Sequence, residues 1–267
     1  MKKKTTIAVI NQKGGVGKTT TVINLASALS ILGQNNLIID LDPQGNATTG
    51  LGGSNNDEEK NIYNLLIKKI ELKDVIKKTN VKNLDIIGSN VNLSGLEVET
   101  ANDSNRAFVL KEILNKENNE LLSKYNNIFI DCPPSLSLLT IMALVASDEL
   151  LVPLQTEFFA LEGITQLVKT IDRIKVNLNP ELMVRGILLT MFDKRNKLSS
   201  QVDQEARNYF KDKVYKTVIP RNVRLSEAPS HGLPCVMYDK SCSGSKSYLK
   251  LADEFLLKKN LSVESAA

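Results

Sequence analysis

The chain has 267 residues, of which 42% are hydrophobic and 24% charged, and a net charge of +4, values typical of a soluble globular protein. This length suits one large α/β domain or two small ones. No apolar run approaches the ~20 residues of a membrane span, and the run after the basic start is too short for a secretory signal. A single histidine argues against a histidine-rich metal site. Three cysteines without metal-ligand spacing fit a reducing intracellular compartment.

The first expected unit is a strand, a glycine-rich loop and a helix. Residues 5–10 contain an apolar, β-favouring run, and residues 18–32 place apolar side chains at helical spacing. Between them, residues 12–20 have the sequence QKGGVGKTT. Such a turn points successive backbone N–H groups at one position beside the positive end of a helix dipole, an arrangement that binds phosphate. Lys18 then supplies a charge for the β- and γ-phosphates, and the Thr19 hydroxyl supplies a ligand for Mg²⁺.

This loop departs from two common phosphate-binding patterns. G-x-x-x-x-G-K-[ST] requires glycine where the chain has Gln12, and the dinucleotide pattern G-x-G-x-x-G fails at Thr20. What remains is a compact K-G-G-x-G-K-T-T with a second lysine, Lys13, five residues before Lys18. A purely structural turn is the competing interpretation. The flanking strand and helix, together with the Lys-Thr pair, favour phosphate binding.

Aspartates end two further expected strands. The buried-strand pattern at 37–42 contains Asp40 and ends in Asp42, and the pattern at 127–131 ends in Asp131. A strand–helix–strand crossover of the first unit's length implies parallel strands, so these carboxylates should meet the glycine-rich loop at one edge of the sheet. An acidic residue there commonly holds Mg²⁺. For each aspartate the alternative is a hydrogen-bond acceptor that caps a strand end.

The rest of the chain alternates strand and helix patterns, with a flexible-looking stretch at 50–60. Helices are expected over 62–69, 73–78, 104–124, 161–176, 199–210 and 244–259, and strands over 84–87, 149–153, 184–190 and 214–219. We find no internal repeat and no inter-domain linker. The expected architecture is α/β: a single doubly wound, mostly parallel sheet flanked by helices, with residues 1–267 as one domain.

These motifs resemble the ParA/Soj family, the deviant Walker A ATPases that partition chromosomes and plasmids. The resemblance is carried by residues 13–20, 40–48 and 131–135, and it extends through 190–193 and 219–232. The last segment is the most specific, because related ATPases with other roles share the first three. The resemblance implies a P-loop NTPase that hydrolyses ATP with the help of Mg²⁺.

The resemblance also implies roles for individual residues. In the family two subunits sandwich two ATP molecules, and the equivalent of Lys13 reaches the partner's phosphates, as an arginine finger does. Asp42 matches the residue that orients or activates the attacking water, and Asp40 and Asp131 match carboxylates that hold the Mg²⁺ shell beside Thr19. The residues expected to contact the nucleotide are Lys13, Gly14, Gly15, Val16, Gly17, Lys18, Thr19, Thr20, Met191, Pro220 and Asn222.

The partners implied by the resemblance are a second copy of the chain, DNA and another protein. The ATP-bound homodimer is expected to bind double-stranded DNA without sequence preference through Arg195 and Arg224, and a ParB/Spo0J-type centromere-binding protein to stimulate hydrolysis. The protein should then be cytoplasmic and nucleoid-associated, without stable membrane association. Further basic candidates are Lys194, Lys197, Arg221, Lys240 and Lys246. Family members often carry arginines where Ser241 and Ser243 stand, which puts the affinity for DNA in question.

Two other classes of ATPase share the Lys-Gly-Gly loop. A MinD-like membrane-positioning ATPase needs a C-terminal basic amphipathic helix that lies on lipid. Here the last helix has an apolar stripe of Tyr248, Ala252 and Phe255, which suits core packing better. A reductase like the nitrogenase iron protein needs cysteines that bridge an iron–sulfur cluster across a dimer. Cys132 lies in the turn beside the Mg²⁺ position and the other two cysteines lie far along the chain.

Overall fold

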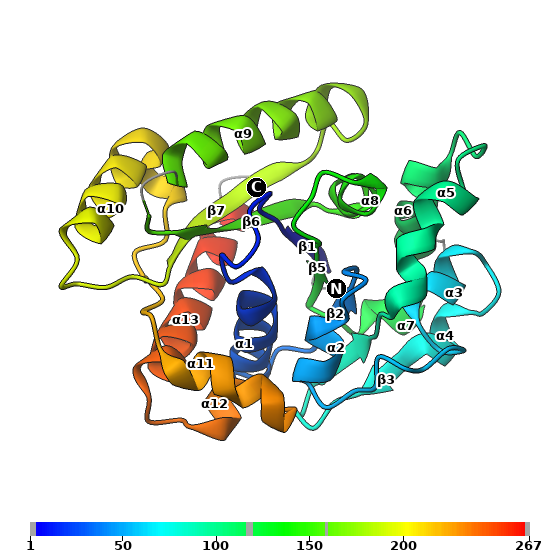
Figure 1. The fold of residues 1–267 in the computed structure, drawn as a ribbon, viewed down its shortest axis with the longest axis horizontal. Helices are drawn as coiled ribbons and strands as arrows, with labels where there is room; N and C mark the ends of the chain where they lie inside the picture. Colours follow the sequence, from blue (N-terminus) through cyan, green and yellow to red (C-terminus); the bar gives the residue numbers. More distant parts are fainter. Residues whose placement is uncertain (1–3, 116–119, 158–159, 265–267) are drawn as a thin grey trace.

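The computed structural model describes residues 4–115, 120–157 and 160–264. Within these ranges one sheet contains seven strands in the order β3-β4-β2-β5-β1-β6-β7 (Figure 1). All neighbouring strands are parallel except β3 and β4, and this confirms the doubly wound α/β fold. The strands are β1 (Thr5–Val9), β2 (Asn36–Asp40), β3 (Ile76–Lys78), β4 (Leu84–Ile87), β5 (Asn127–Asp131), β6 (Glu149–Gln155) and β7 (Met183–Thr190).

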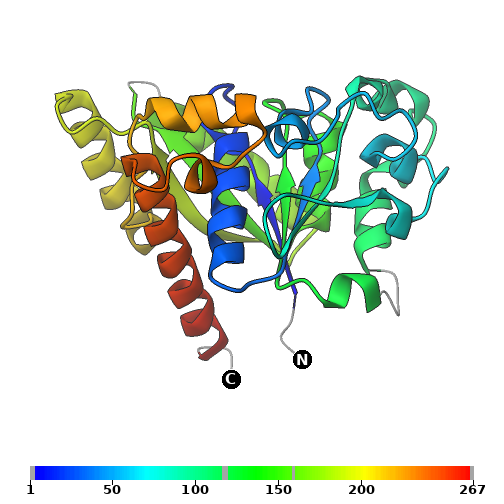
Figure 2. The same ribbon diagram turned by 90° about the horizontal axis from the view of Figure 1, so that it is seen from below.

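Helices cover both faces of this sheet. They are α1 (Lys18–Ile31), α2 (Asn46–Gly50), α3 (Ile62–Leu66), α4 (Leu72–Val75), α5 (Leu96–Glu99), α6 (Val109–Asn115), α7 (Glu120–Ser123), α8 (Leu138–Ala146), α9 (Ala160–Asn177), α10 (Lys197–Phe210), α11 (Val223–Glu227), α12 (Cys235–Tyr238) and α13 (Ser243–Glu264). Both ribbon views place α1 and α13 side by side against the sheet, and their residues are in contact (Figures 1 and 2).

The two faces of the sheet form two separate hydrophobic clusters, because successive side chains of a strand point to opposite sides. In β1, Ile7 and Val9 pack into the cluster under α1 and α13. Ala8, between them, packs into the cluster under α6, α8 and α9. Since the inner strands are buried on both faces, they contain continuous apolar runs, such as residues 37–39 of β2 and 128–130 of β5, as expected for a parallel sheet.

The helix expected at 73–78 is wrong in its second half. The helix α4 ends at Val75, and Ile76–Lys78 forms the edge strand β3. This strand pairs antiparallel with β4, and its last residue, Lys78, makes an ion pair with the buried carboxylate of Asp85 at 3.0 Å. Pairing with a neighbouring strand therefore overrides the local helical pattern.

The strand expected at 214–219 is also wrong, because the segment, which the structure describes in full, forms one isolated bridge, at Val214, and no strand. The N–H groups of Tyr215 and Ile219 reach carbonyls of β7 at 2.9 and 2.8 Å. Between them, the N–H groups of Lys216 and Thr217 donate to the carboxylate of Glu254 on α13 at 2.7 and 2.9 Å. The Glu254 side chain thus accepts hydrogen bonds from backbone N–H groups in the middle of the segment, and these groups are not paired with β7.

The helix expected over 104–124 is divided. Its described parts are a short 3₁₀ turn, α6 and α7, while residues 116–119 lie outside the described part of the chain. Among the described residues, no helix combines the length and the apolarity that crossing a bilayer requires.

Candidate nucleotide-binding site

The glycine-rich loop is hydrogen-bonded to two neighbouring strands, β6 and β7. The Thr190 hydroxyl, at the end of β7, donates to the carbonyl of Val16 at 2.8 Å. The Asn11 side chain donates to the carbonyl of Pro153 in β6 at 2.7 Å and accepts the N–H of Lys13 at 3.0 Å. Because β1, β6 and β7 are parallel, these bonds hold the loop at the carboxyl edge of the sheet, where open α/β folds bind ligands.

Two glycines of the loop adopt left-handed backbone angles. Gly15 has a φ of +75° and Gly17 a φ of +87°, a region that other residues enter only at a cost. Gly17 precedes α1, and no side chain in the described part of the chain caps this helix. The N–H groups of its first turn therefore remain available, beside half-buried Thr19 and Thr20, for an anion at the positive end of the helix.

Lys18 is buried at the start of α1 and folds back over the loop. Only 6% of the residue is exposed, and its Nζ donates to the carbonyl of Lys13 at 3.2 Å. Burial lowers the pKa of this ammonium, and the nearby carboxylates of Asp131 and Asp42 act against that shift. The charge is thus already placed over the backbone that would surround a phosphate.

Asp40 and Asp131 lie next to each other at the ends of β2 and β5, as their register shows. Asp40 is fully buried and well paired: Oδ2 accepts the N–H and the hydroxyl of Thr48 at 2.8 and 2.6 Å, and Oδ1 accepts the N–H of Asp42 at 3.2 Å. Burial raises the pKa of Asp40 to about 6, against these hydrogen bonds. One visible role of Asp40 is therefore to hold the loop that follows β2.

Asp131 is the unpaired group of the site. It is fully buried, and neither carboxylate oxygen has a well-formed hydrogen bond within the described part of the chain. Burial raises its pKa well above the ordinary value, the neighbouring Asp40 adds to the shift, and the Thr19 hydroxyl and Lys18 oppose it. A buried carboxylate without partners is costly. A cation bound beside it would remove that cost.

Asp42 and Lys13 lie at the rim of the site. Asp42 is 7% exposed and accepts the N–H of Gln44 at 3.0 Å, so it is fixed in a turn. Lys13 is exposed, and its ammonium makes an ion pair with Glu157, beyond the end of β6. Sequence patterns do not reveal this partner, because Glu157 lies 144 residues away along the chain.

Three of the residues expected to contact the nucleotide, Met191, Pro220 and Asn222, lie beyond the end of β7. Met191 adopts a left-handed φ of +52°, and Phe192 pairs with Pro220, which brings the 219–222 segment to the end of this strand. The amide of Asn222 is already engaged: Oδ1 accepts the N–H of Arg224 at 2.9 Å, and Nδ2 donates to the Ser243 hydroxyl at 2.8 Å.

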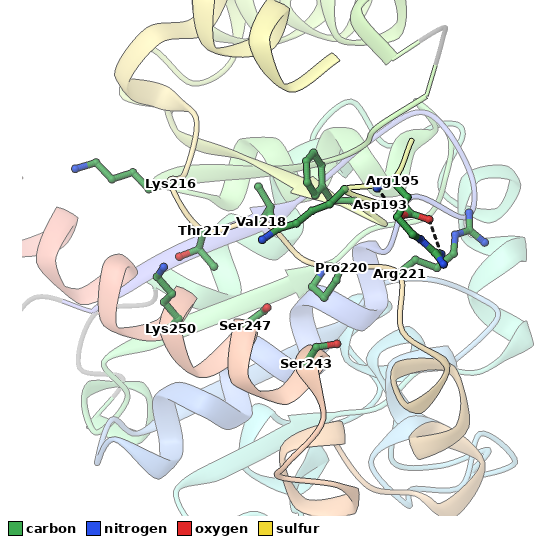
Figure 3. A pocket seen from close by; sticks show the side chains of 12 residues that line it. Asp193, Arg195, Lys216, Thr217, Val218, Pro220, Arg221, Ser243, Ser247 and Lys250 are labelled. Atoms are coloured by element: carbon green, nitrogen blue, oxygen red, sulfur yellow. Dashed lines mark hydrogen bonds and ion pairs between the residues drawn. The ribbon is translucent and has the colours of Figure 1, made fainter. Parts of the chain in front are cut away.

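A basic pocket of about 560 Å³ opens beside this segment (Figure 3). Its lining residues are Phe192, Asp193, Lys194, Arg195, Lys216, Thr217, Val218, Pro220, Arg221, Ser243, Ser247 and Lys250. Arg195 is paired with Asp193 through Nε and Nη2, at 3.1 and 2.9 Å. Two of the cations, Lys216 and Lys250, were missed at the sequence level because they come from unrelated segments.

The other expected DNA-contacting arginine is placed differently. Arg224 does not line the basic pocket. Its guanidinium contacts Glu227 at 2.7 Å and Asp239 at 3.5 Å. Three further basic candidates also lie outside the lining: Lys197, Lys240 and Lys246.

Known proteins with similar sequences identify the family of this chain. Residues 4–184 match the family AAA_31, described as an AAA domain. The chain is 51% identical over 248 residues to the sporulation initiation inhibitor protein Soj of Bacillus subtilis, covering 93% of this chain and 96% of that one. It is 49% identical over 250 residues to the chromosome partitioning protein ParA of Caulobacter vibrioides, covering 94% and 93%.

Solved structures agree with the fold. A cobyrinic acid a,c-diamide synthase from Mycobacterium smegmatis, with a bound ATP analogue and magnesium, superposes with a TM-score of 0.83 at 31% identity, covering 94% and 93% of the two chains. The septum site-determining protein MinD of Pyrococcus horikoshii, complexed with Mg-ADP, gives 0.76 at 26% identity, covering 94% and 96%.

The expected apolar stripe of the last helix belongs to the core, since Tyr248, Ala252 and Phe255 are all buried against α1 and the sheet. This is the packing that disfavoured the membrane-positioning alternative. With a matched domain over more than half of its length and partitioning ATPases at about half identity over nearly all of it, the chain belongs to the ParA/Soj family of chromosome-partitioning ATPases.

Proposed function

We propose that this ATPase is a switch driven by Mg-ATP. Two copies close around two nucleotides, the closed dimer binds DNA without sequence preference, and hydrolysis, stimulated by a ParB/Spo0J-type protein, releases it. The observation that carries the nucleotide part is the convergence at one edge of an uncapped helix N-terminus, buried Lys18 and unpaired Asp131. These are the groups that a triphosphate and its cation would satisfy.

The residues present fit Mg²⁺. Thr19 offers a hydroxyl and Asp131 two oxygens that lack a well-formed hydrogen bond among the described residues, and Mg²⁺ prefers such oxygen ligands together with water and phosphate. Asp40 has one lone pair left on Oδ1 for a magnesium-bound water, since its other acceptor positions are taken. When bound, the ion would neutralise charge on the β- and γ-phosphates.

The dimer part of the proposal rests on Lys13. The two lysines of the loop differ, because Lys18 is buried over its own loop whereas the Lys13 ammonium is exposed and engaged only at the surface. Such a lysine is available to a second copy that approaches this edge. There it would neutralise charge that develops on the partner's phosphates, and Asp42, held in its turn, would orient the attacking water.

The DNA part is supported by the basic pocket. Five of its lining side chains are cations against one carboxylate, Asp193. Contacts from such cations to phosphates are additive, fall with salt and carry no sequence information. Family membership supports cytoplasmic, nucleoid-associated action on chromosome or plasmid cargo.

One experiment tests these parts together. Purified protein is mixed with Mg²⁺ and ATP, a non-hydrolysable ATP analogue or ADP, and its mass is measured by light scattering with and without random-sequence duplex DNA. We expect a monomer with ADP, a dimer with the analogue, and DNA binding by the dimer alone. DNA binding that is equal with ADP and with the analogue would refute the switch. A stable monomer with the analogue would refute the sandwich.

A further inference from the structure

Two cysteines that border the turn between α12 and α13 lie against each other. Cys235 is the first residue of α12 and Cys242 immediately precedes α13, and their Sγ atoms are 3.4 Å apart. Both are free thiols. The separation is van der Waals contact, and a disulfide bond between them would require the sulfurs to approach to about 2.05 Å.

The surroundings of the pair hold both sulfurs in place. The Ser245 hydroxyl lies 3.3 Å from the sulfur of Cys235 and 3.4 Å from that of Cys242. The backbone N–H of Ser245 also donates to the Cys242 sulfur at 3.4 Å, as an N-cap contact of the long helix α13. Asp239, in turn, accepts the N–H of Cys242 at 3.1 Å. The turn between the two helices is therefore ordered around the thiols.

The two thiols differ in exposure and in acidity. Cys235 is fully buried, and burial raises its pKa to about 11. Cys242 is partly exposed. Burial also acts to raise its pKa, but hydrogen bonds with the side chain and N–H of Ser245, with Cys235 and with the N–H of Gly244 outweigh that effect and lower it. A helix N-terminus favours a thiolate in the same way. Cys242 is thus the reactive sulfur, with a second thiol in contact.

We propose that Cys235 and Cys242 are a redox-sensitive pair that a small peroxide converts reversibly into an intramolecular disulfide. The Cys242 thiolate attacks one peroxide oxygen and the O–O bond breaks. The hydroxide that leaves takes a proton from the medium and becomes water. Cys235 then attacks the resulting sulfenic sulfur, the S–O bond breaks and a second water leaves. The sum is two thiols and one hydrogen peroxide giving one disulfide and two waters.

This inference goes beyond the proposed function and does not depend on it, but the pair lies beside residues used there. Ser243, next to Cys242, accepts the hydrogen bond of Asn222. Asp239, in the same turn, contacts Arg224. Because the sulfurs must move closer by more than an ångström, oxidation would shift the turn that supports both contacts. We expect faster amide hydrogen exchange over residues 222–224 in the oxidised protein.

The full chain is tested with hydrogen peroxide, alkylated under denaturing conditions and digested with trypsin. We expect three alkylated cysteines before oxidation and only Cys132 after it. Trypsin cleaves after Arg224, Lys240 and Lys246, so the disulfide should join peptides 225–240 and 241–246 with the loss of two hydrogens. Dithiothreitol should restore both thiols. An oxidised Cys242 with Cys235 still alkylated, or a disulfide between chains, would overturn the proposal.

Matched variants give a second measurement. In the native reduced protein, Cys242 should alkylate about tenfold or more faster than either buried cysteine. Cys242→Ser should protect Cys235 from peroxide, whereas Cys132→Ala should leave the joined peptides unchanged. A Cys242→Ser protein in which Cys235 oxidises at the original rate would show that Cys242 is not the attacking sulfur.

Discussion

The nucleotide edge and the basic pocket are neighbours in the fold, but they are built in opposite ways. At the nucleotide edge Lys18, Asp40 and Asp131 are buried, and neither carboxylate oxygen of Asp131 has a well-formed hydrogen bond among the described residues. In the basic pocket Arg195 exposes 91% of its side chain and is paired with Asp193. A buried, unpaired charge favours one ligand in one position, because only that ligand relieves its desolvation. Exposed, paired arginines tolerate many arrangements of phosphate.

Because of this difference in burial and pairing, the two regions should differ in ligand specificity and in salt dependence. The nucleotide edge should discriminate between ligands steeply and depend little on salt. The basic pocket should discriminate weakly and depend strongly on salt. Four substitutions, in order of decreasing expected effect, test whether the two regions divide the work in this way.

Lys18→Ala should weaken ATP binding by about 100-fold or more, since removing a buried charge that pairs with phosphate costs roughly 2–5 kcal/mol. Titration calorimetry with the non-hydrolysable analogue measures this directly. Lys13→Ala is the matched control. Because this exposed lysine is proposed to reach the partner's nucleotide, its removal should change the affinity of a subunit for its own nucleotide little. Wild-type affinity in Lys18→Ala would remove the phosphate-loop assignment.

Asp42→Ala should lower ATP hydrolysis by about 100-fold, the scale of a lost general base, while ATP still binds. An ATP-bound dimer should then accumulate on DNA. Phosphate release gives the rate, and light scattering gives the mass. Asp42→Asn keeps an acceptor for the N–H of Gln44, so an equal loss there would assign the effect to the charge rather than to the turn. A monomeric Asp42→Ala protein in ATP would contradict the assignment.

Arg195→Glu should weaken DNA binding and lower the salt slope of log K by about one for each phosphate that the protein no longer neutralises, with ATP binding unchanged. Arg224→Glu should have a smaller effect, because this residue lies outside the basic pocket and contacts two carboxylates. Lys73→Glu, on α4 beside the opposite edge strand, is the control. Gel shifts over a salt series that are the same for Arg195→Glu and Lys73→Glu would place the DNA surface elsewhere.

Glu157→Gln should strengthen ATP-dependent dimerisation by no more than about fivefold. The substitution releases Lys13 from its ion pair, and an exposed pair contributes roughly 0.2–1 kcal/mol. The dimer dissociation constant is measured by light scattering against protein concentration. The double variant with Lys13→Ala should lose the gain. A gain that persists without Lys13 would mean that Glu157 acts through another group.

Local patterns predicted six of the seven strands and the meeting of the glycine-rich loop with Asp40 and Asp131 at one edge of the sheet. The strands at 84–87 and 127–131 have the expected bounds, because continuous apolar runs between polar turns leave few alternatives. Because the strands were expected to be parallel, their carboxyl ends, with the loop and the carboxylates, were expected at the same edge of the sheet. The helix α8 was overlooked, since its residues are apolar on all sides and give no helical periodicity.

What escaped prediction depends on contacts between distant segments. The Lys13–Glu157 ion pair and the two cations from residues 216 and 250 in the basic pocket have no local signal. The segment at 214–219 looks like a strand locally, and only the carboxylate of Glu254, from α13, explains why it is not one. Cys235 and Cys242 are close in sequence, but only the turn between two helices makes their sulfurs touch.

The hydrogen bond from Thr190 to the carbonyl of Val16 connects the glycine-rich loop directly to the chain segment that contains Arg195. Thr190 is the last residue of β7, and Asp193 and Arg195 follow within five residues. The glycine-rich loop is therefore hydrogen-bonded to the last residue of β7, and the lining of the basic pocket begins at Phe192, two residues further along the chain. A displacement of the loop at Val16 would therefore act, through this bond, on the backbone that leads to Arg195.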